Sequence, residues 1–396
     1  MSKKSMKISF YTDTYLPAVD GVVSSIREFK RELESRGHTV FLITSGNSET
    51  RRIASKGKNI IVTPSIRFRK YPQYNLSVLP FIDIAKVRVR SSDIVHVHTP
   101  FVMGIYGIIS GRIRNVPVVW TFHTMFTNKD AINQYVPGNE KLRKLIKKHS
   151  WSYIKFIANR CDAVIAPSDA VKHMLNKRGI KNTVVVPNGV NTNRFRREKG
   201  GASPLRKRLL GADKAIVLYV GRLSKEKNLE TLLKAAKLLE NRPIRFVIVG
   251  DGPYAETIKN KASRLGLGGK VTFVGKITKD LPKYYNAADL LCLPSTFETQ
   301  GIVCIEAMSC GKPVVGADYL ALKEVIRNGK NGEKFRPKDA KDCARKIEKV
   351  INNIRLYKEC ESTAERYSIS VVTDQLLSLY GDLIRSKSEK QTGKRG

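Results

Sequence analysis

Two series of short, continuously apolar segments, separated by stretches of helical periodicity, constrain the fold of this chain more than any other feature. Apolar segments without polar alternation are typical of strands buried on both faces, and helices between consecutive strands place them in parallel sheets. In the first half the expected strands are residues 7–11, 39–44, 60–63, 93–98, 117–122, 163–167 and 183–187. In the second half they are residues 215–221, 244–250, 271–275, 290–294 and 313–317. The expected fold class is therefore α/β, with two facing, Rossmann-like, doubly wound domains and a cleft between them.

The junction between the two series gives the domain boundaries. Residues 186–195 contain one proline, one glycine and three asparagines, which is typical of a linker. We expect an N-terminal domain over residues 1–187 and a C-terminal domain over residues 188–368. Residues 369–386 are expected to form a helix that packs back on the N-terminal domain, and the polar residues 387–396 to form a disordered tail.

The chain carries a formal net charge of +37, with 72 lysines and arginines against 35 acidic residues. Because such a charge opposes compaction, polyanionic partners are one explanation: nucleic acid, an anionic membrane surface or phosphorylated substrates. A basic bias throughout the organism's proteins is another. The longest apolar runs, such as residues 101–109, are shorter than a membrane span, and no secretory signal is expected. Six scattered cysteines without a C-x-x-C pair favour reduced, buried thiols in a cytoplasmic protein.

Several common motifs are missing from the sequence. There is no P-loop, and Gly-Asp-Gly at residues 250–252 is only a fragment of a dinucleotide fingerprint, so an ATPase or a nicotinamide dehydrogenase is disfavoured. No H-E-x-x-H motif or Cys/His cluster predicts a metal site, and we expect no metal and no cofactor. His96 and His98 alternate along one expected strand and therefore point to the same face, where a supporting role in the core is favoured over metal ligation.

The stretch FETQGIVCIE, residues 297–306, places two carboxylates around a small apolar turn. Glu298 lies in a loop at the C-terminal edge of the second expected sheet. Gly301 allows a close backbone turn, and the amides that open the following helix can bind an anion such as a diphosphate. Glu306 lies about one and a half turns into that helix, within reach of ribose hydroxyls. The candidate donor-binding residues of this stretch are Glu298, Gly301, Ile302, Val303 and Glu306.

Three further strand-end positions complete the candidate site. Arg222 and Lys227 follow the first strand of the second series, and an arginine fork with a lysine point charge suits a diphosphate whose charge grows as it leaves. Gly21 opens a helix in the first half, where backbone amides can approach a phosphate. His123 follows the expected strand 117–122, a position for polarising or deprotonating a substrate hydroxyl or for hydrogen-bonding a transferred sugar.

Together these residues resemble family 4 glycosyltransferases of the GT-B fold over nearly the whole chain. The resemblance rests on the E-x7-E pattern from Glu298 to Glu306, on GRLSKEKN, on TYLPAVDGVVSSI, on the VPNGV linker and on GDGP. It implies a retaining transfer of a hexose from a nucleotide-sugar, without a required metal. It assigns Glu298 to the hydroxyls of the donor sugar, Glu306 to the ribose, and Arg222 and Lys227 to the leaving diphosphate. It places His123 beside the sugar and the acceptor. The expected donor is UDP-glucose, with GDP-mannose as the alternative.

Within the family, the start of the chain and FHTMF at residues 122–126 look most like the diacylglycerol glucosyltransferases, which make membrane glycolipids. Residues 140–160 agree with a lipid acceptor, because apolar residues at helical spacing alternate with cations, as in helices that lie in an anionic membrane surface. Residues 52–71 add cations. The candidate membrane-binding residues are Lys141, Arg143, Lys144, Lys147, Lys148 and Trp151. The expected partners are a nucleotide-sugar, a lipid acceptor and the inner face of the cell membrane, with no nucleic acid.

Other interpretations of the same residues stay open. A mannosyltransferase acting on a phosphoinositol-type lipid, or a transferase with a soluble acceptor, would use the same donor site. A nucleotide-sugar epimerase or a glycogen-type phosphorylase would share the fold, the latter with a lysine that binds pyridoxal phosphate. Nucleic-acid binding is suggested by charge alone, since aromatic residues are not interleaved with the basic segments. The sugar, the base, the acceptor and the oligomeric state are not determined by the sequence.

Overall fold

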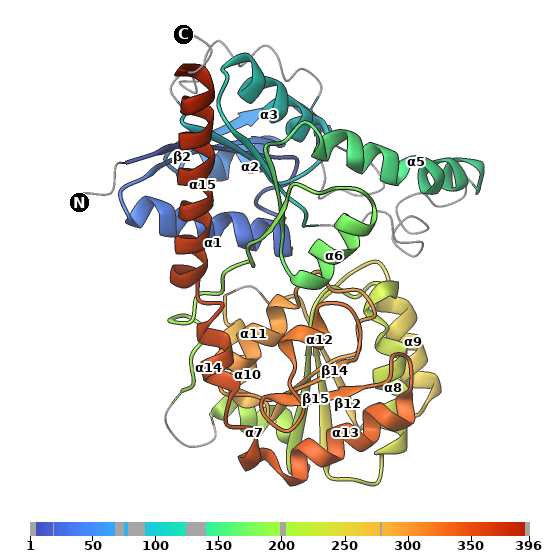
Figure 1. Cartoon of the computed structure of the whole chain (residues 1–396). Helices are drawn as coiled ribbons and strands as arrows, with labels where there is room; N and C mark the ends of the chain where they lie inside the picture. The colour runs from blue at the N-terminus through green and yellow to red at the C-terminus, as the bar shows by residue number, and fades with distance from the viewer. Residues whose placement is uncertain are drawn as a thin grey trace. The chain divides into compact units, whose positions relative to one another are not determined.

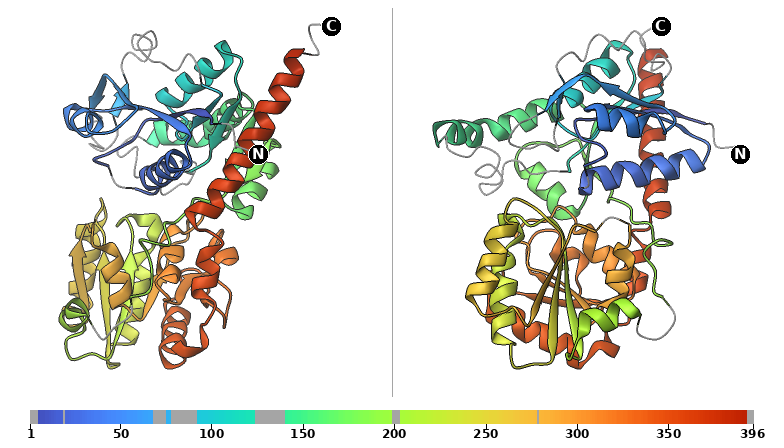
Figure 2. Two further views of the ribbon diagram at one scale, coloured as in Figure 1. Left: turned by 90° about the vertical axis from the view of Figure 1, so that its left-hand side faces the viewer. Right: turned by 180° about the vertical axis from the view of Figure 1, so that it is seen from behind.

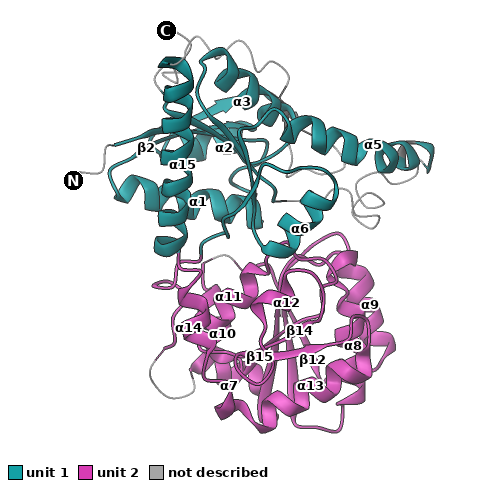
Figure 3. Cartoon of the chain, in the orientation of Figure 1, with its two compact units in different colours: residues 1–189, 369–396 teal, residues 190–368 magenta. Residues whose placement is uncertain are grey.

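The computed structural model describes residues 5–18, 20–67, 75–77, 92–123, 140–198, 203–277 and 279–392. The chain divides into two compact units, residues 1–189 together with 369–396, and residues 190–368 (Figure 1, Figure 3). It passes between them twice, and the two passages are adjacent, since Val190 forms a bridge with Ser368. Parts of three predicted segments lie outside the described residues: 68–71 of the second basic segment, 124–126 after His123, and 393–396 of the tail.

The first unit is built, within its described residues, on a seven-stranded sheet in the order β3-β2-β1-β6-β7-β8-β9. Every neighbouring pair is parallel, as the continuous apolar segments predicted. The strands are β1 (Lys7–Thr12), β2 (Thr39–Ser45), β3 (Ile60–Thr63), β6 (Ile94–Val97), β7 (Val118–Thr121), β8 (Ala163–Ala166) and β9 (Thr183–Val185). The helices are α1 (Gly21–Ser35), α2 (Ser48–Ala54), α3 (Val102–Ile113), α5 (Glu140–Ala158) and α6 (Asp169–Lys177). A short antiparallel pair, β4 (Ser65–Arg67) and β5 (Asn75–Ser77), is separate from this sheet.

The second unit has a six-stranded parallel sheet in its described part, in the order β12-β11-β10-β13-β14-β15. The strands are β10 (Ala215–Val220), β11 (Ile244–Val249), β12 (Val271–Gly275), β13 (Leu290–Leu293), β14 (Val314–Ala317) and β15 (Gly332–Phe335). The helices are α7 (Pro204–Leu210), α8 (Leu229–Leu238), α9 (Ala255–Arg264), α10 (Leu281–Ala287), α11 (Ile302–Ser309), α12 (Leu322–Val325), α13 (Ala340–Asn352) and α14 (Cys360–Glu365). Two 3₁₀ turns, η2 (Lys225–Lys227) and η3 (Ile354–Leu356), complete it.

Within the two parallel sheets, β15 is the described strand that the sequence patterns missed; the short pair β4 and β5 was not predicted either. The sequence of β15, GEKF, is half polar, yet Glu333 is fully buried. The Glu333 carboxylate pairs with Lys346 Nζ at 2.6 Å and with Lys349 Nζ at 2.7 Å, both on α13. Because a buried charge is tolerated only when it is paired and hydrogen-bonded, these two lysines make the strand possible. Tertiary partners, and not strand propensity, therefore determine this edge of the sheet.

Local sequence signals fix where several helices begin. Asp20, Ser168 and Asp339 each accept a hydrogen bond from a backbone N–H in the first turn of α1, α6 and α13, respectively. Ser203 does the same for α7, where Pro204 occupies the first turn. Such side chains satisfy amides that have no acceptor within the helix. The covering helices are thus positioned by residues that the sequence displays directly.

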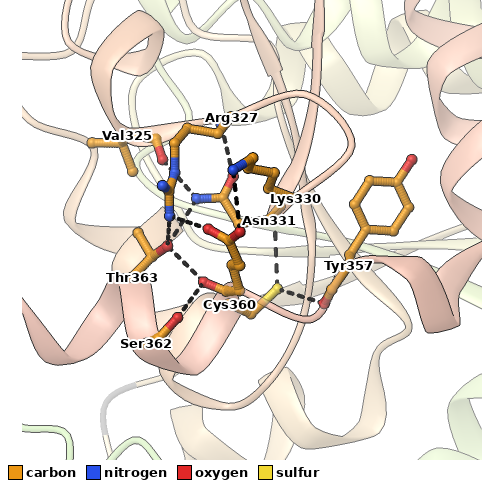
Figure 4. A network of polar contacts seen from close by, with 9 residues as sticks. Val325, Arg327, Lys330, Asn331, Tyr357, Cys360, Ser362 and Thr363 are labelled. Atoms are coloured by element: carbon orange, nitrogen blue, oxygen red, sulfur yellow. Dashed lines mark hydrogen bonds and ion pairs between the residues drawn. The ribbon is translucent and has the colours of Figure 1, made fainter.

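Polar side chains fix α14 to the connection between β14 and β15 (Figure 4). Arg327 pairs with Glu359 at 2.6 Å, and Asn331 donates to Thr363 Oγ1 at 3.1 Å. Asn331 and Thr363 are fully buried, so a group left without its partner there would cost about 1–3 kcal/mol. The thiol of Cys360 donates to the carbonyl of Asn331. This network holds the helix from which the chain leaves the second unit.

The C-terminal helix α15 (Ile369–Thr392) packs against α1, which it crosses in Figure 1 and in the right-hand view of Figure 2. Its residues Val372 and Leu376 are fully buried in the core of the first unit. Arg36, at the end of α1, donates to Asp374 Oδ1 at 2.7 Å. The last segment of the chain is therefore part of the first unit's core.

For residues 387–392 the prediction of a disordered tail is wrong, because α15 continues through Thr392. Lys387 lies 3.7 Å from Asp162 and Gln391 donates to the carbonyl of Asn115 at 3.2 Å. These contacts with distant parts of the first unit tether the last turns. Polar composition indicated disorder, but residues such as Lys, Glu and Gln also propagate a helix that packing has already begun.

Three imidazoles, His96, His98 and His123, form a stacked column in the first unit, called the histidine column below. The ring centroids of His96 and His98 are 4.1 Å apart, and those of His98 and His123 are 5.4 Å apart. The hydroxyl of Tyr380, on α15, lies 2.5 Å from His96 Nδ1, and Thr121 Oγ1 lies 2.6 Å from His96 Nε2. Burial lowers the pKa of His96 and His98 well below the usual range and that of His123 to about 3. All three imidazoles are therefore neutral in the fold.

Asp13 is also a buried titratable group of the first unit, and no sequence pattern singled it out. Its carboxylate accepts from the amide of Met103 at 2.9 Å and from the hydroxyl of Thr99 at 2.6 Å. It thereby joins the C-terminal end of β1 to the start of α3. Burial raises the pKa of Asp13 to about 6, and the hydrogen bonds from Met103 and Thr99 limit the rise.

Replacing Val372 by Ala should lower the free energy of unfolding of the first unit by about 2 kcal/mol, since two buried methyl groups are lost. Its neighbour Val371 has 40% of its surface exposed, so Val371→Ala, the same deletion on the same helix, should change stability by less than about 0.5 kcal/mol. Urea unfolding followed by tryptophan fluorescence measures this, because both tryptophans, Trp120 and Trp151, lie in the first unit. Equal effects of the two variants would contradict the docking of α15.

The free energy of unfolding of the first unit should also fall as the pH is lowered below about 6.5. The histidine column stays neutral in the fold, whereas unfolded histidines take up protons near that pH. Asp13 acts in the opposite sense, because its folded-state pKa is raised from 3.8 to about 6 and the fold holds its proton there. Three imidazoles against one carboxyl leave a net uptake of protons on unfolding, so the free energy of unfolding should fall as the pH is lowered from about 6 towards 4.

The same urea unfolding, repeated across that pH range, measures the slope. His98→Asn removes one of the buried titrating groups and should reduce the slope by about one proton. His173 is exposed on α6, and His173→Asn serves as the matched control. A slope that His98→Asn leaves unchanged would show that the imidazoles of the column are not the cause.

Candidate functional site

The loops that follow β10 and β13 form the charged part of the candidate site in the second unit. The two strands are parallel neighbours in the sheet, so both loops emerge at its C-terminal edge. Lys227 Nζ lies 2.6 Å from Glu298 Oε1, and this ion pair joins the loops. Asn228 donates to the carbonyl of Pro294 at 3.3 Å. The structure thus brings together a cation and a carboxylate that are 71 residues apart in the sequence.

Glycines allow the loops after β10 and β11 to approach each other. Gly250 has a φ of +146°, and a Cβ there would lie 1.8 Å from the carbonyl oxygen of Gly221. A Cβ at Gly252 would lie 2.4 Å from the carbonyl oxygen of Leu223. Any side chain at either position would therefore push the loop that carries Arg222. The Gly-Asp-Gly fragment at residues 250–252 is therefore a close-packed turn after a strand. The sequence, which lacks the rest of a dinucleotide-binding fingerprint, favoured such a turn.

Arg222 lies in the same loop, half-buried, one residue after Gly221. Its carbonyl accepts a hydrogen bond from the Tyr219 hydroxyl at 3.0 Å. Burial, with the nearby carboxylates of Glu298 and Glu226, raises the pKa of Tyr219 well above its usual range. Tyr219 is therefore a neutral donor at any physiological pH, and its hydrogen bond holds the backbone from which Arg222 extends.

Gly301 caps α11 in the left-handed conformation, with a φ of 83°. The carbonyl of Gly301 accepts from the amide of Cys304, and the first-turn positions of the helix are occupied by Ile302 and Val303, both half-buried. Backbone N–H groups of a first helical turn have no acceptors within the helix and carry partial positive charge. The expected order of a strand, a glycine turn and a helix N-terminus is thus present at this edge of the sheet, and anion binding there stays a prediction.

Glu306 lies on α11, half-buried, and accepts a hydrogen bond from the Tyr285 hydroxyl at 2.7 Å. Burial and the adjacent carboxylate raise the pKa of Tyr285 well above its usual range, so the phenol remains a donor. Sequence reasoning did not single out Tyr285, because nothing in the pattern of α10 distinguishes it from a core aromatic residue. The bond fixes one carboxylate oxygen of Glu306 and orients the other.

Gly21 and His123 belong to the first unit and not to this cluster. Gly21 is exposed and opens α1, whose first turn is capped by the Asp20 carboxylate, 2.9 Å from the amide of Val23. His123 follows β7 directly and is the last member of the histidine column, with its Nε2 3.1 Å from His98 Nδ1. Both residues follow strands at the C-terminal edge of the seven-stranded sheet.

The candidate membrane-binding residues lie on α5. Lys141, Lys144, Lys147 and Lys148 are exposed, whereas Arg143 and Trp151 are half-buried. The helix buries Ile154 and Ile157 in the core, so it has an inward-facing side. Its outward-facing side also carries apolar residues, since Leu145 and Phe156 are 55% and 47% exposed. The indole of Trp151 lies under the Arg178 guanidinium at 4.7 Å, and not among the exposed lysines.

An apolar row on α3 extends the exposed surface of the same unit, and sequence reasoning did not identify it. Phe101, at the cap, and then Ile105, Ile109 and Ile113 are all exposed at four-residue spacing, with Ile113 79% exposed. The exposed positions of this helix are apolar up to Arg112. The Arg112 side chain donates to the carbonyl of Arg160 at 3.0 Å, which connects the end of α3 to the end of α5. No described helix is long and apolar enough to cross a bilayer.

Within the described part of the chain, no group of three or more His, Cys, Asp or Glu side chains is arranged to hold a metal ion. The six cysteines are all free and buried.

Two family models match successive parts of the chain. Residues 19–194 match Glycosyltransferase Family 4, and residues 205–367 match Glycosyl transferases group 1. The alpha-monoglucosyldiacylglycerol synthase of Streptococcus pneumoniae is 33% identical over 80% of this chain and 72% of that protein. The enzyme of the same name from Acholeplasma laidlawii is 26% identical over 97% of this chain and 99% of that protein.

The fold has a solved counterpart as well. The crystal structure of Anabaena Alr3699/HepE in complex with UDP and glucose covers 95% of this chain and 100% of its own, with a TM-score of 0.75 and 22% sequence identity. These matches confirm the resemblance seen in the sequence and the two parallel α/β sheets as the GT-B architecture. The chain therefore belongs to glycosyltransferase family 4 and is a glycosyltransferase of the GT-B fold.

Proposed function

We propose that the protein transfers a hexose, with glucose as the first candidate, from a nucleotide-sugar to a lipid acceptor such as diacylglycerol at the inner face of the cell membrane. The names of the two relatives, both alpha-monoglucosyldiacylglycerol synthases, support a lipid acceptor and glucose. The UDP and glucose held by the solved counterpart support a UDP-sugar donor. The observation that carries the proposal is the Lys227–Glu298 pair beside the N-terminus of α11.

The chemistry proposed for this cluster follows from its charges. In the transfer, the bond from the sugar's anomeric carbon to the diphosphate oxygen breaks, and a bond from the acceptor oxygen forms. Negative charge grows on the leaving diphosphate, where Lys227, Arg222 and the first amides of α11 would stabilise it. Glu298 would orient the Lys227 ammonium and accept hydrogen bonds from hydroxyls of the sugar. The acceptor's proton would pass to a phosphate oxygen of the donor, with retention at the anomeric carbon and without a required metal.

Glu306 has a separate role in the proposal. The Tyr285 hydroxyl holds one of its oxygens at 2.7 Å, and the other would accept from the ribose hydroxyls of the donor. Such a contact is made equally in the bound donor and in the transition state, so it contributes to donor binding more than to the rate of the chemical step.

The surface of α5 and α3 supports a membrane partner. The exposed residues of α5 include five lysines together with the apolar Leu145 and Phe156, and a hydrogen bond from Arg112 to the carbonyl of Arg160 connects the end of the apolar row on α3 to the end of α5. Apolar side chains that enter the headgroup layer, flanked by cations, bind anionic lipid surfaces, with about 1 kcal/mol for each basic residue near the surface. An acceptor held in the bilayer would then be presented to the protein along this face.

Lys227→Ala and Arg222→Ala should each lower turnover by at least about 100-fold, the scale for removing one aligned donor to a developing anion. Lys225 is exposed on the same 3₁₀ turn, and Lys225→Ala, the same change two residues away, should alter turnover by less than about threefold. Glu306→Ala should instead raise the dissociation constant of the donor, measured by calorimetry. Near-normal turnover of Lys227→Ala would refute the leaving-group role.

A transfer assay tests the reaction itself. Radiolabelled UDP-glucose or GDP-mannose is incubated with the protein and with anionic vesicles that contain diacylglycerol or a phosphoinositol lipid. Label from UDP-glucose that enters the organic phase only when diacylglycerol is present supports the proposal, and the anomeric configuration of the product tests retention. Label that stays in water with every lipid would refute a lipid acceptor, and conversion of the sugar without any acceptor would identify an epimerase. Addition of EDTA tests the metal requirement.

Replacing Lys144, Lys147 and Lys148 together by Ser should weaken binding to anionic vesicles, by up to about 3 kcal/mol if all three lysines approach the surface. A variant with Lys234, Lys338 and Lys358 replaced by Ser loses the same charge from exposed positions of the second unit and is the matched control. Vesicle sedimentation measures both. If the two variants bind vesicles equally, net charge and not α5 is responsible for membrane attraction.

A further inference from the structure

The histidine column contains a hydrogen bond whose direction the structure determines. His98 Nδ1 lies 3.1 Å from His123 Nε2. The other nitrogen of His98, Nε2, is buried and has no hydrogen-bond partner within the described residues. His98 as a whole is 1% exposed. The ring is packed against Phe10 at 4.6 Å and against His96 at 4.1 Å between centroids, so a change of ring orientation is sterically opposed.

Two proton arrangements are compatible with one bond between these neutral rings, because each neutral imidazole has one donor and one acceptor nitrogen. In the first arrangement, His98 Nδ1–H donates to His123 Nε2, and the unpartnered His98 Nε2 is a bare acceptor. In the second, His123 Nε2–H donates to His98 Nδ1, and His98 must carry its proton on the unpartnered Nε2. Buried donors without an acceptor are rarer in proteins than unused acceptors, and each costs about 1–3 kcal/mol. The first arrangement is therefore favoured.

We propose that His98 is a positioning residue that holds His123 with its proton on Nδ1, so that His123 acts on substrate as a hydrogen-bond donor and not as a general base. The lone pair of His123 Nε2 is occupied by His98. To accept a proton at Nδ1, His123 would first have to move its own proton to Nε2, and His98 would have to move its proton to the unpartnered Nε2. The proposal rests on the proposed function for the placement of His123 beside the sugar and acceptor.

Neutrality of the rings, on which the proton count depends, follows from their burial, which lowers the pKa of each imidazole in the column. His96 contributes by stacking on His98, and it is itself held at both nitrogens, by Tyr380 and by Thr121. The column thereby connects the C-terminal helix to the ring of His123. A hydrogen-bond donor at this position suits an uncharged sugar hydroxyl, whereas removal of the acceptor's proton is left to the donor phosphate.

Nuclear magnetic resonance of the whole protein with ¹⁵N-labelled histidine tests the proton positions directly. The chain has six histidines, and the signals of His123 are assigned by their loss in His123→Gln. The expected result is a protonated Nδ1 and an unprotonated Nε2 on His123. A proton found on His123 Nε2 in the unaltered protein would overturn the proposal, and this measurement needs neither activity nor a variant of His98.

Two variants at position 98 separate positioning from packing. His98→Asn retains an amide N–H near the place of Nδ1 and should keep the proton of His123 on Nδ1. His98→Leu removes the donor and should give averaged nitrogen signals, as the proton of His123 exchanges between its two sites. In the transfer assay, His98→Asn should keep kcat within about threefold, whereas His98→Leu should lower kcat by at least about tenfold, with a smaller change in the KM of the donor.

The experiments on His98 and the lipid transfer assay can fail independently of each other. If no lipid is glucosylated but His123 carries its proton on Nδ1 and loses this preference in His98→Leu, the positioning role stands and the assigned substrate is wrong. If Asn and Leu at position 98 lower kcat equally, or if neither changes the nitrogen signals of His123, the role of His98 is one of packing alone and the proposal fails.

Discussion

All strands of a parallel sheet end at the same edge, and this constraint places every candidate functional residue that the structure brings together. In the second unit β10 and β13 are neighbours, so the loops after them meet, and Lys227 reaches Glu298 at 2.6 Å. In the first unit β6 and β7 are neighbours, so His98 and His123 meet at 3.1 Å. Helices between consecutive strands create this geometry, because such crossover connections keep the strands parallel and cover both faces of the sheet.

The two units use that edge in different electrostatic settings. Lys227 and Glu298 keep 20% and 13% of their side-chain surface exposed, so charged groups sit where an anionic ligand could reach them. In the histidine column, His96 and His98 are buried against Phe10, with Tyr380 of α15 on His96, and all three imidazoles are neutral. The second unit can thus stabilise charge on a ligand. The first unit can offer directional hydrogen bonds from uncharged imidazole rings.

The last helix connects these properties to the integrity of the first unit. Val372, Leu376 and Tyr380 of α15 belong to its core, and the Tyr380 hydroxyl is a hydrogen-bond partner of His96. The core that covers the seven-stranded sheet therefore includes a helix that follows the whole second unit in the sequence. Because the buried face of α15 includes a polar partner of the histidine column, its docking is coupled to the position of the rings and not only to the burial of apolar surface.

The sequence by itself determined most strands of the two parallel sheets, the helix caps and the strand-end loops, because continuous apolar segments, capping residues and glycines act through local physical chemistry. E-x7-E and GRLSKEKN were enough to identify the family. Only the tertiary structure decided the rest: that Tyr285 holds Glu306, that Glu333 is buried between two lysines in β15, that α15 runs to Thr392, and which nitrogen of His98 lacks a partner. Each of these depends on a polar group whose partner lies on another element, and desolvation makes such pairings decisive only once the chain has packed.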